Sequence, residues 1–105
     1  MTDMDEMEMC CCRVISAVGS ARSCYVEAIH KAKDGDYEGA RKLIEEGKEC
    51  FIQGHDAHLE LFQKQGEGKL DFNMLILHAE DQLMSAEAFG ILAEEFISVY
   101  QAMGK

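Results

Sequence analysis

The sequence predicts an all-α fold, an antiparallel up-down-up bundle of three helices. Apolar residues make up 48% of the 105 residues and proline is absent, so a folded core and long uninterrupted helices are expected. Two segments repeat apolar or small residues at alternating spacings of three and four, which is typical of helices packed along their length, and a third segment has a broad apolar arc. Short glycine-containing turns separate them, which favours antiparallel neighbours. A chain of this length is expected to form a single domain over residues 1–105.

The first helix is expected over residues 4–33. Its apolar seam consists of Met4, Met7, Cys11, Val14, Val18, Ala21, Tyr25, Ala28 and Ala32. The run GSARS, residues 19–23, lies in the middle of this helix, and its small residues allow a neighbouring helix to approach closely. Arg22 within the run is interpreted as a surface cation, with a phosphate ligand as the alternative. In the turn that follows, Gly35 can take the left-handed conformation and Asp36 can cap the next helix.

The second helix is expected over residues 37–65. Its seam consists of Tyr37, Ala40, Ile44, Gly47, Phe51, Gly54, His58 and Leu61. Gly47 and Gly54 each weaken a helix by about 1 kcal/mol relative to alanine, but they let a neighbouring helix come close. His55 and His58 are interpreted as a partly buried, hydrogen-bonded pair. The alternatives are zinc ligation, which usually needs four ligands, and a place in the same pocket as the histidine of the third helix.

The third helix is expected over residues 72–103, after a turn at residues 66–70, with Asp71 as its N-cap. Its acidic residues gather on one solvated side, namely Glu80, Glu87, Glu94 and Glu95. The remaining arc spans about half of the circumference, which is wider than the roughly 100° that one bundle needs. The surplus apolar surface is expected to be buried in a partner, most commonly in a closed symmetric homo-oligomer.

The segment MLILHAEDQLM, residues 74–84, carries the strongest sign of chemistry. At about 100° per residue, Asp81 falls within the apolar arc, with His78 beside it. A carboxylate in an apolar seam is costly unless it is paired, hydrogen-bonded or bound to a metal. Histidine side chains are mostly neutral and nucleophilic at cellular pH. In a symmetric oligomer Asp81 can meet its own copies on the axis, where like charges require a cation or a shared proton.

Charge and composition exclude several classes of function. The net charge of −10 argues against binding to nucleic acid or anionic membranes, and favours a partner with a positively charged docking face. The apolar runs are too short to span a membrane, and the acidic start of the chain is unlike a signal peptide. Cys10, Cys11 and Cys12 form no CxxC motif and are interpreted as packing residues and incidental thiols in a reducing cytosol. A cytoplasmic location is expected.

The run LILHAEDQLMSA, residues 75–86, resembles the HAQDHLM signature of the lactose/cellobiose-type enzyme IIA proteins of the bacterial phosphoenolpyruvate-dependent sugar phosphotransferase system. The GSARS run, the AKDGDYEGA run at residues 32–40 and His55 agree with this family in order and spacing. The likeness extends over residues 9–103 and implies a three-helix protomer assembled as a homotrimer.

The resemblance also implies a function. His78 would accept a phosphoryl group from the phosphocarrier protein HPr and pass it to a cysteine of enzyme IIB, which phosphorylates the sugar during uptake. The sugar would be a β-glucoside or disaccharide such as cellobiose or lactose. Asp81 would be the buried residue that meets a divalent cation, Mg²⁺, on the trimer axis.

Three positions depart from the family pattern. Glu80 stands where the family usually has glutamine, Gln82 where it usually has histidine, and His58 where it tends to have glutamine. Gln82 lies one helical turn from His78, so it can donate a hydrogen bond to a phosphoryl group but cannot carry a positive charge. Ser85 is a second candidate donor. The opposite exchanges at Gln82 and His58 suggest that these two positions compensate for one another.

Two other functions stay open from the sequence. The first is a histidine phosphotransfer domain of a two-component relay, although HAEDQLM lacks the lysine-glycine pair that typically follows such a histidine. The second is a non-enzymatic helical adaptor, in which His78 and Asp81 form a core hydrogen bond or a metal staple. A relay requires that a second protein can reach the imidazole of His78, whereas an adaptor does not.

Overall fold

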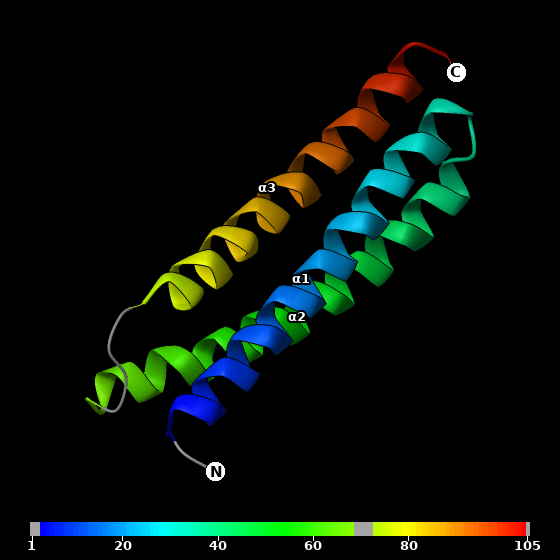
Figure 1. The fold of residues 1–105 in the computed structure, drawn as a ribbon. Helices are drawn as coiled ribbons and strands as arrows, with labels where there is room; N and C mark the ends of the chain where they lie inside the picture. Colours follow the sequence, from blue (N-terminus) through cyan, green and yellow to red (C-terminus); the bar gives the residue numbers. More distant parts are fainter. Residues whose placement is uncertain (1–2, 69–72, 105) are drawn as a thin grey trace.

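The computed structural model describes residues 3–68 and 73–104, and there it contains three α-helices: α1 (Asp3–Lys33), α2 (Tyr37–Gly66) and α3 (Met74–Ala102). The helices run side by side in the order up, down, up (Figure 1). They form a rod of 54 × 18 × 17 Å. The predicted all-α, up-down-up bundle is therefore confirmed, and each helix begins and ends within two residues of its predicted bounds.

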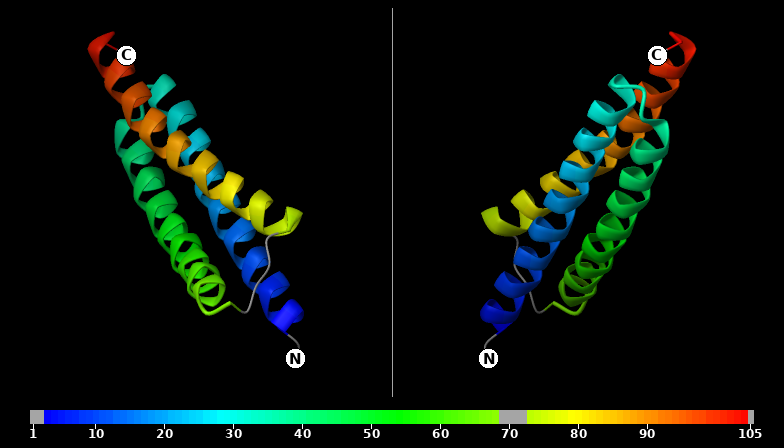
Figure 2. Two further views of the ribbon diagram at one scale, coloured as in Figure 1. Left: turned by 90° about the vertical axis from the view of Figure 1, so that its left-hand side faces the viewer. Right: turned by 90° about the vertical axis from the view of Figure 1, so that its right-hand side faces the viewer.

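The two ends of the rod carry different connections. The α1–α2 turn lies at the same end as the C-terminal end of α3, whereas the start of α1 lies at the other end, near the end of α2 (Figures 1 and 2). None of the described helices is long and apolar enough to cross a membrane.

α1 forms one wall of the core along its whole length. Its predicted seam residues are buried from Met7 to Ala32, while the side chain of Met4 lies outside the described part. One half of the core gathers around Val14, Leu61 and Leu83, and the other around Tyr25, so every helix contributes to the core.

The two glycines of the α2 seam lie where side chains of α1 pack directly against the backbone of α2. A Cβ atom at Gly54 would lie 2.5 Å from Cγ1 of Val18, and one at Gly47 would lie 2.5 Å from Cε1 of Tyr25. Because alanine does not fit without a shift, the close approach predicted from these glycines is confirmed.

The helix caps agree with the sequence at the start of α2 and differ from it at the start of α3. The Asp36 carboxylate accepts a hydrogen bond from the Gly39 N–H at 2.9 Å, and Gly35 takes a positive φ of 85°. At α3 the cap is Asn73, whose side-chain oxygen accepts from the Ile76 N–H at 3.0 Å. The predicted cap, Asp71, lies outside the described residues, and the helix begins two residues later than a cap there requires.

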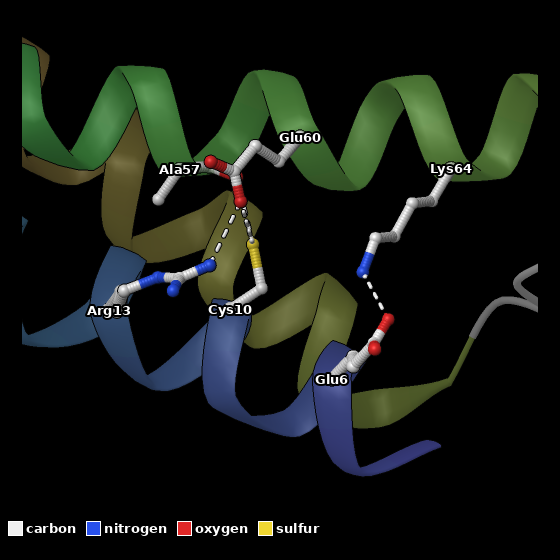
Figure 3. A network of polar contacts seen from close by, with 6 residues as sticks. All are labelled: Glu6, Cys10, Arg13, Ala57, Glu60 and Lys64. Carbon is white, nitrogen blue, oxygen red and sulfur yellow. Dashed lines mark hydrogen bonds and ion pairs between the residues drawn. The ribbon is translucent and has the colours of Figure 1, made fainter. Parts of the chain in front are cut away.

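Polar contacts join the first half of α1 to the last half of α2 (Figure 3). The Cys10 thiol donates to the carbonyl oxygen of Ala57 at 3.0 Å, Arg13 pairs with Glu60 at 2.9 Å, and Lys64 pairs with Glu6 at 3.0 Å. All five cysteines are free thiols. Burial, helped by the neighbouring Cys10 and Cys12, raises the pKa of the Cys11 thiol to about 11, so that this side chain stays uncharged in the core.

Candidate functional site

His78 lies in the second turn of α3 and is exposed. It is neither sealed in the core nor hydrogen-bonded to Asp81 within the described chain. A second protein can therefore reach the imidazole in the single protomer, which is the condition that a relay requires. The core hydrogen bond proposed for an adaptor is absent between these two residues.

Asp81 is exposed as well in the single protomer. The residues of α3 that are buried against the rest of the protomer form another line, which does not include Asp81: Ile76, Ala79, Leu83, Ala86, Ala93 and Ile97. The seam that contains Asp81 faces outward, and its exposed apolar members are Met74, Leu77, Met84, Leu92 and Val99. We call these five residues, with Asp81 among them, the outer face of α3. Asp81 therefore lies among apolar residues, as the spacing predicts, but in a single chain these residues are exposed to solvent.

Arg22 connects α1 to the part of α3 that follows His78. Its Nη1 donates to Oε1 of Gln82 at 2.7 Å and lies 3.5 Å from Oγ of Ser85. Arg22, Gln82 and Ser85 are each half-buried. Gln82 and Ser85 follow His78 by four and seven positions, so the three lie in a row along one side of the helix. The guanidinium is thus bound to an amide and a hydroxyl on the side of α3 that also carries the imidazole.

These contacts revise the interpretation of Arg22 as a surface cation. Its guanidinium lies between two helices and is hydrogen-bonded to Gln82. The alternative interpretation, that Arg22 is a phosphate ligand, is therefore favoured. The signal in the sequence was the placement of a single long cation among the small residues of GSARS, because small neighbours leave it free to reach across to another helix.

His58 pairs with Glu80 rather than with Gln82. Nε2 of His58 contacts Oε1 of Glu80, and the side chain of His58 is only 17% exposed. The predicted compensation between His58 and Gln82 is therefore wrong, because Gln82 is bound to Arg22 instead. Glu80 is not simply a solvated acid, since it ties α3 to α2.

The two histidines of α2 do not form the predicted hydrogen-bonded pair. His55 is exposed and stacks on Phe51, with ring centroids 6.4 Å apart, while His58 turns to Glu80. Over residues 3–68 and 73–104, no three His, Cys, Asp or Glu side chains lie close enough together to hold a metal ion. The zinc alternative for these histidines therefore finds no third ligand in the described part of one chain.

The family described as "PTS system, Lactose/Cellobiose specific IIA subunit" matches residues 9–101. The lichenan-specific phosphotransferase enzyme IIA component of Bacillus subtilis is 37% identical over 98 residues, which cover 92% of this chain and 89% of that protein. The lactose-specific EIIA component of Staphylococcus epidermidis is 29% identical over 98 residues, which cover 92% and 94% respectively.

A solved structure agrees with these relatives. The crystal structure of the PTS cellobiose-specific enzyme IIA from Bacillus anthracis superimposes with a TM-score of 0.89 at 32% identity, and the match covers 93% of this chain and 91% of that chain. The resemblance read from HAEDQLM is thereby confirmed. The chain belongs to the lactose/cellobiose-specific IIA subunits of the sugar phosphotransferase system.

Proposed function

We propose that this protein is a phosphocarrier of sugar uptake, in which His78 accepts a phosphoryl group from phosphorylated HPr and hands it to a cysteine of enzyme IIB. Membership of the family makes the chain a component of a phosphotransferase system. The observation that carries the proposal is the exposed imidazole of His78, at the histidine of the family motif, beside a row of hydrogen-bonding groups. The exchange takes place in the cytoplasm.

The chemistry asks the protein mainly for positioning and for stabilisation of charge. A neutral imidazole nitrogen of His78 attacks the phosphorus in line with the donor nitrogen. The new N–P bond forms as the donor's N–P bond breaks, and the donor nitrogen keeps the bonding electron pair. In the second transfer a thiolate sulfur of enzyme IIB attacks the same phosphorus, and the electron pair of the breaking N–P bond returns to His78.

Gln82 is suited to hold the phosphoryl group in this scheme. Because Arg22 donates to Oε1 of Gln82, the amide is oriented and its NH₂ group is left as the donor. The amide lies one helical turn from His78, within reach of a phosphoryl oxygen there. Gln82 therefore positions the group, and the imidazole of His78 makes and breaks the bonds.

The assembly we propose is a homotrimer whose outer faces of α3 meet around a central axis. An exposed apolar stripe along most of a helix favours burial against copies of itself. One chain supplies a single carboxylate at this place, Asp81, and three copies would supply three oxygen ligands of the kind that Mg²⁺ prefers. The cation would offset the repulsion between the carboxylates. It has no part in the transfer of the phosphoryl group.

The sugar served by the pathway is proposed to be a β-glucoside or disaccharide such as cellobiose or lactose. The relatives are named for lichenan, lactose and cellobiose, which supports this class. The chain itself would carry only the phosphoryl group. The family match argues against both the two-component phosphotransfer domain and the adaptor.

Incubation with phosphoenolpyruvate, enzyme I and HPr tests the proposal. The protein is expected to gain the mass of one acid-labile phosphoryl group. His78→Ala should abolish this gain and leave the helical content unchanged, because the residue is exposed. His55→Ala, which removes an exposed histidine of α2, should leave it intact. A gain that persists in His78→Ala, or no gain in the unaltered protein, would overturn the assignment.

A further inference from the structure

Arg22 differs from the other paired basic residues of the chain in what it contacts. Arg13, Lys48 and Lys64 each pair with a carboxylate, of Glu60, Glu94 and Glu6 respectively. In the part of the chain that the structure describes, the recorded partners of the Arg22 guanidinium are the neutral oxygens of Gln82 and Ser85, and it has no ion pair. Its positive charge is thus left available to an anion.

A half-buried guanidinium without a carboxylate partner costs desolvation free energy that a purely structural contact to neutral oxygens does not offset. Neutral oxygens satisfy some of its five N–H donors but do not neutralise its charge, and partial burial removes some of the water that would do so. Such a group gains most from an incoming anion that can accept two parallel hydrogen bonds, which is the geometry of a phosphoryl group.

The Arg22 side chain can be reached from solvent. A groove of about 410 Å³ runs beside it between α1 and α3, lined by Arg22, Ser23, Val26, Glu27, His30 and Phe89. Arg22 therefore lies with the polar row of α3 on one side and an open groove on the other. Side chains four apart on a helix have Cβ atoms about 5–6 Å from one another, so His78 is a neighbour of Gln82, whose Oε1 accepts from the guanidinium of Arg22.

We propose that Arg22 binds the phosphoryl group while His78 carries it, giving the phosphoryl oxygens the N–H donors that its contacts with Gln82 and Ser85 leave free. This inference rests on the proposed phosphocarrier function. Arg22 stays protonated throughout and forms no covalent bond, so the bonds that form and break remain those between phosphorus and nitrogen. The need for such a cation is clear, because a dianionic group is added to a chain of net charge −10 and the neighbouring Gln82 carries no charge.

Arg22→Gln tests this role in exchange with phosphorylated HPr. The variant removes the charge and keeps hydrogen-bonding capacity. The fraction of protein phosphorylated at equilibrium should fall, with the exchange constant shifting about tenfold or more toward phosphorylated HPr. The kcat for acceptance should fall while KM for phosphorylated HPr stays close to that of the unaltered protein, because the charge acts on the phosphoryl group rather than on docking.

Arg13→Gln is the matched control. It removes a guanidinium from the same helix at the α1–α2 contact, and its exchange constant should be unchanged. If Arg22→Gln melts like the unaltered protein and keeps the same exchange constant, Arg22 is a structural link and the inference is overturned. If Arg22→Gln fails to fold, Arg22→Lys tests in its place whether Arg22 binds the phosphoryl group. Lysine keeps the charge but makes a single-point contact, so a severalfold shift is expected and an unchanged constant refutes the role.

The two proposals fail in distinguishable ways. If neither the unaltered protein nor Arg13→Gln gains a phosphoryl group, the phosphocarrier function is wrong. If both gain it and Arg22→Gln exchanges equally well, only the role of Arg22 is wrong.

Discussion

His58 and Glu80 join α2 to α3 close to the turn of α3 that carries His78. Both stand where the family usually has glutamine, so the two departures contact one another. A histidine and a carboxylate form a stronger contact than two amides when the histidine is protonated, and at least a hydrogen bond when it is neutral. We therefore expect the residue at one position to depend on the residue at the other, and the pair joins α3 to α2 just beside the site.

We predict that His58 and Glu80 are energetically coupled. His58→Gln and Glu80→Gln should each lower the free energy of unfolding by up to about 1 kcal/mol, since the pair is partly exposed. The double variant restores the residues usual in the family, and its loss should be smaller than the sum of the two single losses. Urea denaturation at one fixed protein concentration measures all three. Glu87→Gln, at an exposed acid of the same helix, is the control and should be nearly neutral. Strict additivity would contradict the coupling.

At the residue scale, the sequence predicted His78 and Gln82 as site residues, because the motif carries both. It did not predict which residues they contact. The reach of Arg22 to Gln82 and of His58 to Glu80 depends on how the helices are rotated about their axes. A single sequence records spacing within a helix and leaves that rotation between helices undetermined, which is why His58 was assigned to the wrong partner.

At the scale of the helices, one tyrosine shows how the three elements fit together. The ring of Tyr25 in α1 lies against Gly47 of α2 and Gly90 of α3, where an added Cβ atom would lie 2.5 and 3.0 Å from ring atoms. Glycine on two helices makes room for one aromatic side chain on the third. The apolar seams of α1 and α2 could be predicted from the alternating spacing of three and four along each helix.

α3 could not be read in the same way. It carries two nearly opposite apolar lines, one through Leu83 that is buried in the protomer and one through Asp81 that is exposed. Periodicity detects a stripe but cannot decide which of two stripes meets α1 and α2. The line that is buried in the protomer contains small residues such as Ala79, Ala86 and Ala93, which let α3 pack closely against the other helices.

The fit at Gly54 gives a prediction for the α1–α2 contact. Gly54→Ala should destabilise the protein by roughly 1–2 kcal/mol, because overpacking against the stiff side chain of Val18 outweighs the gain in helix propensity. Thermal unfolding followed by circular dichroism measures the change. Gly66→Ala, in the same helix, adds a Cβ atom where nothing lies within 4 Å, and it should be neutral or stabilising. Equal effects of the two substitutions would argue against the close approach.

At the scale of the whole molecule, α3 carries apolar residues on the side that packs in the protomer and on the side that faces outward. Within the described part of the chain, Met74 is 82% exposed and Met84 is 64% exposed, and both belong to the outer face of α3. A lone protomer with such a stripe is expected to associate. The outer face lies next to His78 in sequence, so burial of that face would place the site at the edge of an interface and leave the groove beside Arg22 to a phosphoryl donor.

The proposed trimer predicts a particular response to removal of divalent cations. With Mg²⁺ the unaltered protein should have three times the mass of the protomer by light scattering, and chelation with EDTA should weaken the assembly, because three Asp81 carboxylates would then repel one another. Asp81→Leu makes the outer face uniformly apolar, so this variant should stay assembled in EDTA and still accept a phosphoryl group at His78.

Asp56→Leu controls for the loss of an exposed acid elsewhere. Asp56 lies on α2, and its replacement should leave the sensitivity to EDTA unchanged. A protein that is monomeric with and without Mg²⁺ would show that the outer face has another partner. An Asp81→Leu variant that dissociates would show that apolar contact alone does not hold the assembly. If Asp81→Leu stays trimeric but no longer accepts a phosphoryl group, Asp81 belongs to the transfer site. Its role would then be in phosphoryl transfer rather than in assembly.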